Sequence, residues 1–259
     1  MTIDSSSIIS NKTKIHPSVN IGPFCIIGDD VEIEEGTNVL SHVIIKGPTK
    51  IGKNNTIYQF SSIGEDTPDK KFKGEDTKLI IGDDNVFREG VTVHRGTIQD
   101  KGVTKIGNGN LLMAYTHIAH DCLVGDNNVF ANNAGIAGHV SVDNYVVIGG
   151  YSAVHQFCSL GDYSFAGMNT SITMDVPAYT KVASNPARVI GLNSVGMSRN
   201  NIPSESISLI KKAFKIIYKK GLKLEDSLKE IDILLAETND TYLDIFSQSI
   251  KASSRGILR

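Results

Sequence analysis

Apolar residues recur at every sixth position along most of the first 172 residues of this 259-residue chain. One run continues without a slip at Ile9, Ile15, Ile21, Ile27, Ile33, Val39, Ile45, Ile51, Ile57 and Ile63. A later run comprises Ile106, Leu112, Ile118, Val124, Phe130, Ile136, Val142, Ile148, Val154, Leu160, Ala166 and Ile172. A period of six matches neither the strand period nor the helix period, so it predicts a repeating unit of short strand plus tight turn.

The architecture typical of this period is the hexapeptide β-helix, in which one side chain per unit points into a narrow core. Three hexapeptides form one triangular coil, so residues 18 apart stack on successive coils. We therefore predict an all-β left-handed parallel β-helix, a triangular prism, followed by a small C-terminal α-helical domain. An ordinary β-sandwich is the alternative, but its strands would not keep one period through ten units.

Two segments interrupt the period, Glu65–Leu79 and Thr97–Thr104, and both are expected to leave the prism as loops. Long loops on a rigid scaffold usually carry function, although a loop without function is an alternative. From about Ser204 the apolar spacing becomes helical, with three predicted helices. The expected division is residues 1–190 for the β-helix, with loop insertions near 65–79 and 97–104, and residues 191–259 for a helical domain that covers the open end of the solenoid.

The formal net charge of −2 argues against general nucleic-acid binding. Neither a signal peptide nor a transmembrane segment is recognisable, so a cytoplasmic protein is expected. The three cysteines show no pairing pattern and are interpreted as reduced. Five lysines on the first predicted helix form either a solvated face or a docking surface for an acidic partner: Lys211, Lys212, Lys215, Lys219 and Lys220.

Four histidines fall within the later run: His117, His120, His139 and His155. Because residues 18 apart stack, His120, Gly138 and Gln156 should form one column on the outer wall, with His139 beside Gly138. Three interpretations are open: His120 is a general base acting on a hydroxyl, three histidines bind a catalytic metal, or the histidines only pack. No nucleophile elbow, P-loop or dinucleotide fingerprint is present, so we expect neither a cofactor nor a covalent nucleophile.

Several segments resemble the UDP-N-acetylglucosamine O-acyltransferases of lipid A biosynthesis: IGPFC (21–25), IYQFSSIGE (57–65), VTVHRGT (91–97), HIAHDC (117–122), AGHVSV (137–142), AVHQF (153–157) and SSRGILR (253–259). The resemblance implies transfer of a 3-hydroxyacyl chain from acyl carrier protein to the 3-hydroxyl of UDP-N-acetylglucosamine by a homotrimer with sites between subunits. It implies His120 as general base and the Gly138 backbone as oxyanion donor. Implied contacts to the sugar nucleotide are Asp69, His117, His139, Gln156, Asn193 and Arg199, with the basic Lys71 near the site.

The chain departs from the family pattern at three positions. Asn200 stands where well-known members have a second arginine, and Val195 stands where they have glutamate. These two departures leave a 3-amino sugar nucleotide open as the alternative acceptor. The histidines leave open a different reaction, a metal-dependent hydration like that of the carbonic anhydrases built on this fold. Met168 occupies a position that limits acyl-chain length in the family, which predicts a shorter preferred chain than in members with glycine there.

Asp121 could orient His120, but alternation along a strand would point the two side chains to opposite faces.

Overall fold

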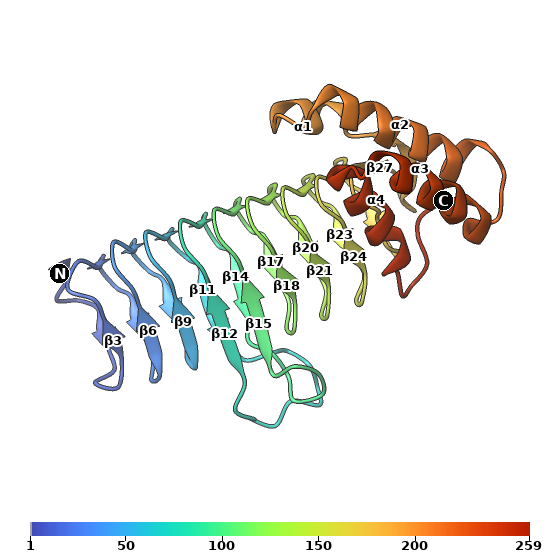
Figure 1. Ribbon diagram of the computed structural model, residues 1–259. Helices are drawn as coiled ribbons and strands as arrows, with labels where there is room; N and C mark the ends of the chain where they lie inside the picture. The colour runs from blue at the N-terminus through green and yellow to red at the C-terminus, as the bar shows by residue number, and fades with distance from the viewer. Residues whose placement is uncertain (1) are drawn as a thin grey trace.

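The backbone forms a three-sided prism of stacked coils, with helices at the C-terminal end and the N-terminus at the opposite end (Figure 1). The structure is a computed structural model that describes residues 2–259. The predicted left-handed parallel β-helix is confirmed. Each face of the prism is one hydrogen-bonded sheet, and we call the three sheets face A, face B and face C.

Face A has eleven strands in the order β1 (Thr2–Ile3), β4 (Asn20–Ile21), β7 (Asn38–Val39), β10 (Thr56–Ile57), β13 (Val86–Phe87), β16 (Leu111–Leu112), β19 (Val129–Phe130), β22 (Val147–Ile148), β25 (Phe165–Ala166), β27 (Thr180–Ala183) and β28 (Arg188–Leu192). Face B has nine: β2 (Ile8–Ile9), β5 (Ile26–Ile27), β8 (Ile44–Ile45), β11 (Ser62–Glu65), β14 (Thr92–His94), β17 (His117–Ile118), β20 (Gly135–Ile136), β23 (Ala153–Val154) and β26 (Ser171–Ile172). Face C has eight: β3 (Lys14–Ile15), β6 (Val31–Ile33), β9 (Thr49–Ile51), β12 (Lys78–Ile81), β15 (Val103–Ile106), β18 (Leu123–Val124), β21 (Ser141–Val142) and β24 (Ser159–Leu160).

The register between coils follows the hexapeptide period. His117 pairs with Gly135, and Gly135 pairs with Ala153, so residues 18 apart lie side by side. Among residues 2–259, all strand pairs are parallel except β27 with β28, which form an antiparallel hairpin that was not expected from the sequence. The inward residue of each hexapeptide is buried from Ile21 onward, as expected, whereas Ile9 and Ile15 in the first coil are only partly buried.

At most corners of the prism the chain turns through a residue in the left-handed backbone conformation. Most of these residues are not glycine: Tyr115 and Tyr151 turn the corner between faces A and B, while Asp121, His139 and Phe157 turn the corner between faces B and C. Their φ angles lie between 58° and 65°. A side chain at such a position leaves the regular alternation of a strand, which matters for the site below.

The two interruptions of the period leave the prism as neighbouring loops, residues 66–77 between β11 and β12 and residues 95–102 between β14 and β15 (Figure 1). Arg95 joins them, because its backbone N–H donates to the Glu65 carbonyl and its guanidinium binds Asp66. The coils on either side remain paired, since β12 hydrogen-bonds directly to β9 and to β15.

Four helices follow the last coil: α1 (Ser194–Arg199), α2 (Ser204–Lys219), α3 (Leu224–Thr238) and α4 (Thr241–Lys251). The three longer helices match the predicted ones, whereas the short α1 was not predicted. Their buried residues form a second apolar cluster with Tyr179 and Met197. The Asp175 carboxylate then accepts hydrogen bonds from Ser253, Ser254 and Arg255, which holds the C-terminal segment against the last coil. Among residues 2–259, none of the helices has both the length and the apolar character needed to cross a membrane.

A ladder of buried asparagines runs along the inside of the corner between faces C and A. The Asn85 side-chain oxygen accepts from the backbone N–H and the side-chain NH₂ of Asn110, both at 2.9 Å. Asn85 in turn donates both of its own groups to the oxygen of Asn55. The ladder supplies acceptors for N–H groups that are buried away from water, which is a requirement for a stable interior.

We expect Asn85→Ala to lower the free energy of unfolding by about 3 kcal/mol, because it removes the acceptor of two buried donors. Urea denaturation monitored by circular dichroism measures the change. Asn132→Ala is the matched control, since that asparagine is exposed, and it should change stability by less than about 0.5 kcal/mol. Equal effects of the two substitutions would contradict a stabilising role of the ladder.

Candidate functional site

His120 and Asp121 lie at the corner between faces B and C, where the chain passes from β17 to β18. The imidazole Nδ1 of His120 and the Oδ2 of Asp121 are 2.9 Å apart. The expectation that these neighbouring side chains point to opposite faces is wrong, because Asp121 turns the corner with φ of 58° rather than continuing a strand. The backbone turn therefore brings the carboxylate to the imidazole.

The Asp121 carboxylate is buried and has several donors. Both of its oxygens accept from the Thr97 backbone N–H, at 2.9 and 3.0 Å, and Oδ2 also accepts from the Thr97 hydroxyl at 2.6 Å. Burial raises the pKa of Asp121, but the hydrogen bonds from His120 and Thr97 outweigh it, so the pKa is below its usual range. An ionised carboxylate only accepts hydrogen bonds, so His120 donates through Nδ1 and its Nε2 keeps a free lone pair.

Gly138 lies against the His120 ring on the next coil, as the 18-residue spacing predicts. A Cβ at Gly138 would lie 2.5 Å from Cε1 and 2.6 Å from Nε2 of His120, so no other residue fits without displacing the ring. Within residues 2–259 the Gly138 N–H donates no hydrogen bond to the protein. The arrangement places a free imidazole nitrogen beside an unused backbone donor. Gln156, the third member of the column, is exposed.

The other histidines separate into different environments. The rings of His120 and His139 meet edge to face with centroids 5.0 Å apart. His117 instead pairs with the Thr92 hydroxyl at 2.7 Å and contacts the His94 ring. Burial lowers the pKa of His117 and lowers the pKa of His94 to about 4, so both are neutral near pH 7. His155 is exposed, and its Nδ1 faces the carbonyl oxygen of Gln156 at 3.2 Å.

One group of side chains in this corner has ligand atoms close enough to share a metal ion. His120, Asp121 and His139 each offer one atom, all within 4.8 Å of one another. The group contains two histidines and an aspartate, whereas the sequence-based metal hypothesis required three histidines. The Nδ1 atoms of both histidines already face carboxylates.

Asn193 and Arg199 lie on a different side of the prism from His120. They line a cavity of about 450 Å³ on face A, together with Tyr145, Phe165 and Lys181. Asn193 also caps α1, because its Oδ1 accepts from the Gly196 N–H at 3.0 Å while its Nδ2 donates to the Tyr163 carbonyl at 2.8 Å. The cavity has two cations and no carboxylate among its lining residues.

The remaining predicted residues lie in the loop 66–77, at a corner of the prism and at α1. Asp69 and Lys71 are in the loop 66–77, where the Asp69 carboxylate accepts from the Lys71 backbone N–H at 2.9 Å. Met168 lies at the corner between faces A and B, and 75% of its surface is exposed. Val195 is exposed as well, and the Asn200 amide donates to the Gly196 carbonyl at the end of α1.

Three residues of these regions were not expected from the sequence: Thr97, Asp100 and Lys181. Thr97 and Asp100 belong to the loop 95–102, which was expected to carry function, but a loop outside the period has no register from which contacts follow. Asp100 reaches the Nδ1 of His139 at 2.8 Å. Lys181 lies in β27, and its ammonium is 5.2 Å from the centre of the Phe165 ring.

The prism of stacked coils, with His120 and His139 at the corner between faces B and C, has the architecture of the hexapeptide-repeat transferases. Residues 104–138 match the family model "Bacterial transferase hexapeptide (six repeats)", and residues 175–258 match "Udp N-acetylglucosamine O-acyltransferase; Domain 2". The acyl-[acyl-carrier-protein]–UDP-N-acetylglucosamine O-acyltransferases of Stutzerimonas stutzeri and Pseudomonas entomophila are 51% and 49% identical to this chain, over 99% or more of it and 99% of each relative. The chain therefore belongs to this family of O-acyltransferases.

Solved structures agree. The UDP-N-acetylglucosamine O-acyltransferase of Moraxella catarrhalis superposes with a TM-score of 0.97 at 47% identity, over 100% of both chains. The enzyme of Francisella novicida superposes with a TM-score of 0.96 at 39% identity, over 100% of this chain and 94% of the other. The similarity covers the prism, both loops and the helices.

Proposed function

We propose that this protein transfers a 3-hydroxyacyl chain from acyl carrier protein to the 3-hydroxyl of UDP-N-acetylglucosamine, the first step of lipid A biosynthesis. The observation that carries the proposal is the His120–Asp121 pair beside Gly138. The relatives reported above are named as acyl-[acyl-carrier-protein]–UDP-N-acetylglucosamine O-acyltransferases, which supports the acyl donor and the acceptor in this proposal. The geometry supplies a base and an oxyanion donor within one corner, as acyl transfer to a hydroxyl requires.

In the proposed mechanism, Nε2 of His120 takes the proton of the sugar hydroxyl as its oxygen attacks the thioester carbonyl. The charge that develops on the carbonyl oxygen is stabilised by the Gly138 N–H, which donates to no other group among residues 2–259. The C–S bond then breaks, the ester remains on the sugar, and the imidazolium returns its proton to the departing thiolate. Asp121 holds the ring in the correct tautomer and stabilises the imidazolium.

The test is transfer of labelled 3-hydroxyacyl groups from acyl carrier protein, with chelator present. His120→Ala should lower kcat by about 10²–10⁴-fold, because it removes the general base. His16→Ala, a change to an exposed histidine at the far end of the prism, is the control and should leave kcat unchanged. Wild-type-like turnover of His120→Ala would disprove the role of His120.

The same assay separates the alternatives. Transfer only to the 3-amino analogue would replace the acceptor in the proposal. No transfer to either acceptor, together with a hydration activity that chelator abolishes, would favour a metal site at His120, Asp121 and His139, whose ligand atoms lie close enough to share an ion.

We further propose a homotrimer whose sites lie between subunits. In a single chain the cavity with Arg199 and Lys181 is on face A, whereas His120 lies at the corner between faces B and C. Two cations beside aromatic rings suit a nucleotide diphosphate. One bound sugar nucleotide could reach both regions only if a neighbouring subunit supplied one of them. The residues proposed to contact it are Asp69, Lys71, His117, His139, Gln156, Asn193 and Arg199.

Co-expression of His120→Ala and Arg199→Ala chains tests this arrangement. Each substitution alone should inactivate the enzyme, whereas mixed trimers would contain some sites with both residues intact. Random assembly at equal amounts predicts recovery of about a quarter of the wild-type activity. Activity no higher than that of the separate variants would show that both residues come from one chain.

Met168 is proposed to limit the length of the acyl chain, as a neighbouring subunit would cover this exposed side chain. Each methylene accommodated in an apolar tunnel contributes about 0.8 kcal/mol. We expect Met168→Gly to shift the preference for kcat/KM towards longer chains, measured with acyl carrier protein loaded with a series of lengths. Met168→Leu, a change of similar volume, is the control and should keep the wild-type preference. An unchanged preference in Met168→Gly would contradict the role.

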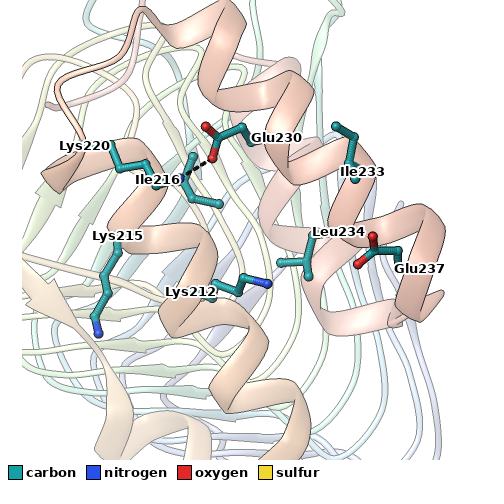
Figure 2. A pocket seen from close by; sticks show the side chains of 8 residues that line it. All are labelled: Lys212, Lys215, Ile216, Lys220, Glu230, Ile233, Leu234 and Glu237. Carbon is teal, nitrogen blue, oxygen red and sulfur yellow. Dashed lines mark hydrogen bonds and ion pairs between the residues drawn. The ribbon is translucent and has the colours of Figure 1, made fainter.

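We propose the exposed lysines of α2 as the docking surface for acyl carrier protein, which is acidic. Lys212, Lys215 and Lys220 line a groove of about 390 Å³ between α2 and α3. Figure 2 shows Lys220 joined to Glu230, whereas Lys215 points away from α3. Cations that are not paired within the chain are available for a partner's carboxylates.

The double substitution Lys211→Glu/Lys215→Glu should raise KM for acyl carrier protein about tenfold at low salt, without a change in KM for the sugar nucleotide. High salt should reduce the difference because these charges are exposed. The control is Lys229→Glu on α3, outside this surface, which should leave both KM values close to wild type. Equal effects of the two variants would exclude a specific surface on α2.

The division of the chain into a β-helix (1–190) and a helical domain (191–259) is likewise our proposal. It is supported by two apolar clusters, one mainly inside the prism and one mainly among the helices, although Leu258 belongs to the first and Ala178 and Tyr179 belong to the second. Expression of residues 1–190 alone tests it: a folded prism with cooperative unfolding is expected, and an unfolded product would contradict independent domains.

A further inference from the structure

A second aspartate–histidine pair lies next to His120 and Asp121. The Oδ2 of Asp100 and the Nδ1 of His139 are 2.8 Å apart, although the two residues are 39 positions apart in the sequence. His139 turns the corner of the coil above Asp121, and Asp100 comes from the loop 95–102. Both side chains are partly covered: 14% of the His139 side-chain surface and 33% of the Asp100 side-chain surface are exposed. The loop therefore delivers a carboxylate to the wall of the prism.

The base of this loop is held by the carboxylate that orients His120. Thr97 donates its backbone N–H and its hydroxyl to Asp121. The Thr97 carbonyl then accepts from the Gly102 N–H at 3.0 Å and from the Asp100 N–H at 3.4 Å, which closes the loop into a turn. The position of Asp100 is thus tied to the His120–Asp121 pair through one residue.

The plane of the His139 ring is fixed by its neighbours. Phe157 stacks on it with centroids 4.5 Å apart and an angle of 7° between the planes, and the His120 ring meets it at 87°. Stacking leaves one freedom, a half-turn of the ring about its Cβ–Cγ bond, which exchanges the positions of Nδ1 and Cδ2 and those of Nε2 and Cε1. A carboxylate on one side removes this freedom, because it accepts only from an N–H.

We propose that Asp100 is a positioning residue that holds His139 with its proton on Nδ1 and its Nε2 turned outward as a hydrogen-bond acceptor. The outward Nε2 receives an O–H or an amide N–H of the acceptor sugar nucleotide. The inference rests on the proposed function for the identity of that ligand, but the orientation of His139 is a property of the free protein.

The kinetic test compares Asp100→Ala, Asp100→Asn and the matched control Lys101→Ala, an exposed residue of the same loop. Asp100→Ala should raise KM for UDP-N-acetylglucosamine about tenfold and change kcat by less than about twofold, because it weakens substrate binding and not the chemical step. In Asp100→Asn the KM for UDP-N-acetylglucosamine should stay close to the wild-type value, since the amide oxygen accepts the same hydrogen bond. Lys101→Ala should behave as wild type.

A double-mutant cycle separates positioning from a general loss of loop structure. In a His139→Ala background, Asp100→Ala should add less than about a twofold further change, because Asp100 acts only through the imidazole. A full effect of Asp100→Ala in that background, or equal losses in Asp100→Asn and Asp100→Ala, would overturn the inference.

A spectroscopic readout keeps the inference independent of turnover. Nitrogen chemical shifts of ¹⁵N-labelled histidine, assigned through His139→Gln, should report the Nδ1–H tautomer of His139 in the wild type at pH 8. Asp100→Ala should lose this single form, whereas Lys101→Ala should keep it. The Nε2–H tautomer in the wild type would overturn the inference even if the enzyme transfers acyl groups. Absence of transfer with the expected tautomer would instead contradict the proposed function.

Discussion

The hydrogen-bonded register between successive coils is the constraint on which the rest of this structure depends. Every strand except β28 pairs in parallel with a strand of a neighbouring coil, so residues 18 apart lie side by side wherever no loop intervenes. This register stacks the inward apolar residues into one core and the asparagines into one ladder. It also places His120 against Gly138. A slip of the register by one residue would turn the core side chains outward and would also separate His120 from Gly138. The apolar core and the site therefore depend on the same register.

Asp121 links the stacked coils to the loop 95–102 through its hydrogen bonds with Thr97. Its carboxylate is removed from water, which costs free energy unless hydrogen bonds compensate. His120 and Thr97 provide this compensation, and the same contacts orient the proposed base and fix the base of the loop 95–102. Asp100 then extends the network to His139. A rigid coil and an irregular loop thus share one buried charge, so the loop adopts a defined position beside the corner of faces B and C.

Much of the fold and part of the site could be predicted from the sequence. The period predicted the coils, both loops and the contact between His120 and Gly138, because stacking depends only on residue spacing. The contact of Asp121 with His120 was not predicted, since strand alternation does not apply to a residue at a corner with positive φ. Asn193 was identified only as a ligand residue, whereas its side chain also caps α1. The hairpin of β27 and β28 was missed, because the residues on either side of its Asn185–Pro186 turn have no regular apolar period.

The sequence by itself determined the repeating coil, the apolar core and the column that carries His120. These follow from local spacing, because backbone hydrogen bonds convert a period in the chain into a column in space. Only the tertiary structure decided which carboxylates meet which imidazoles, how the loop 95–102 lies against the prism, and that Arg199 and His120 are on different sides of one chain. Those contacts join segments without a common period, and they depend on side-chain packing and corner geometry that no spacing rule describes.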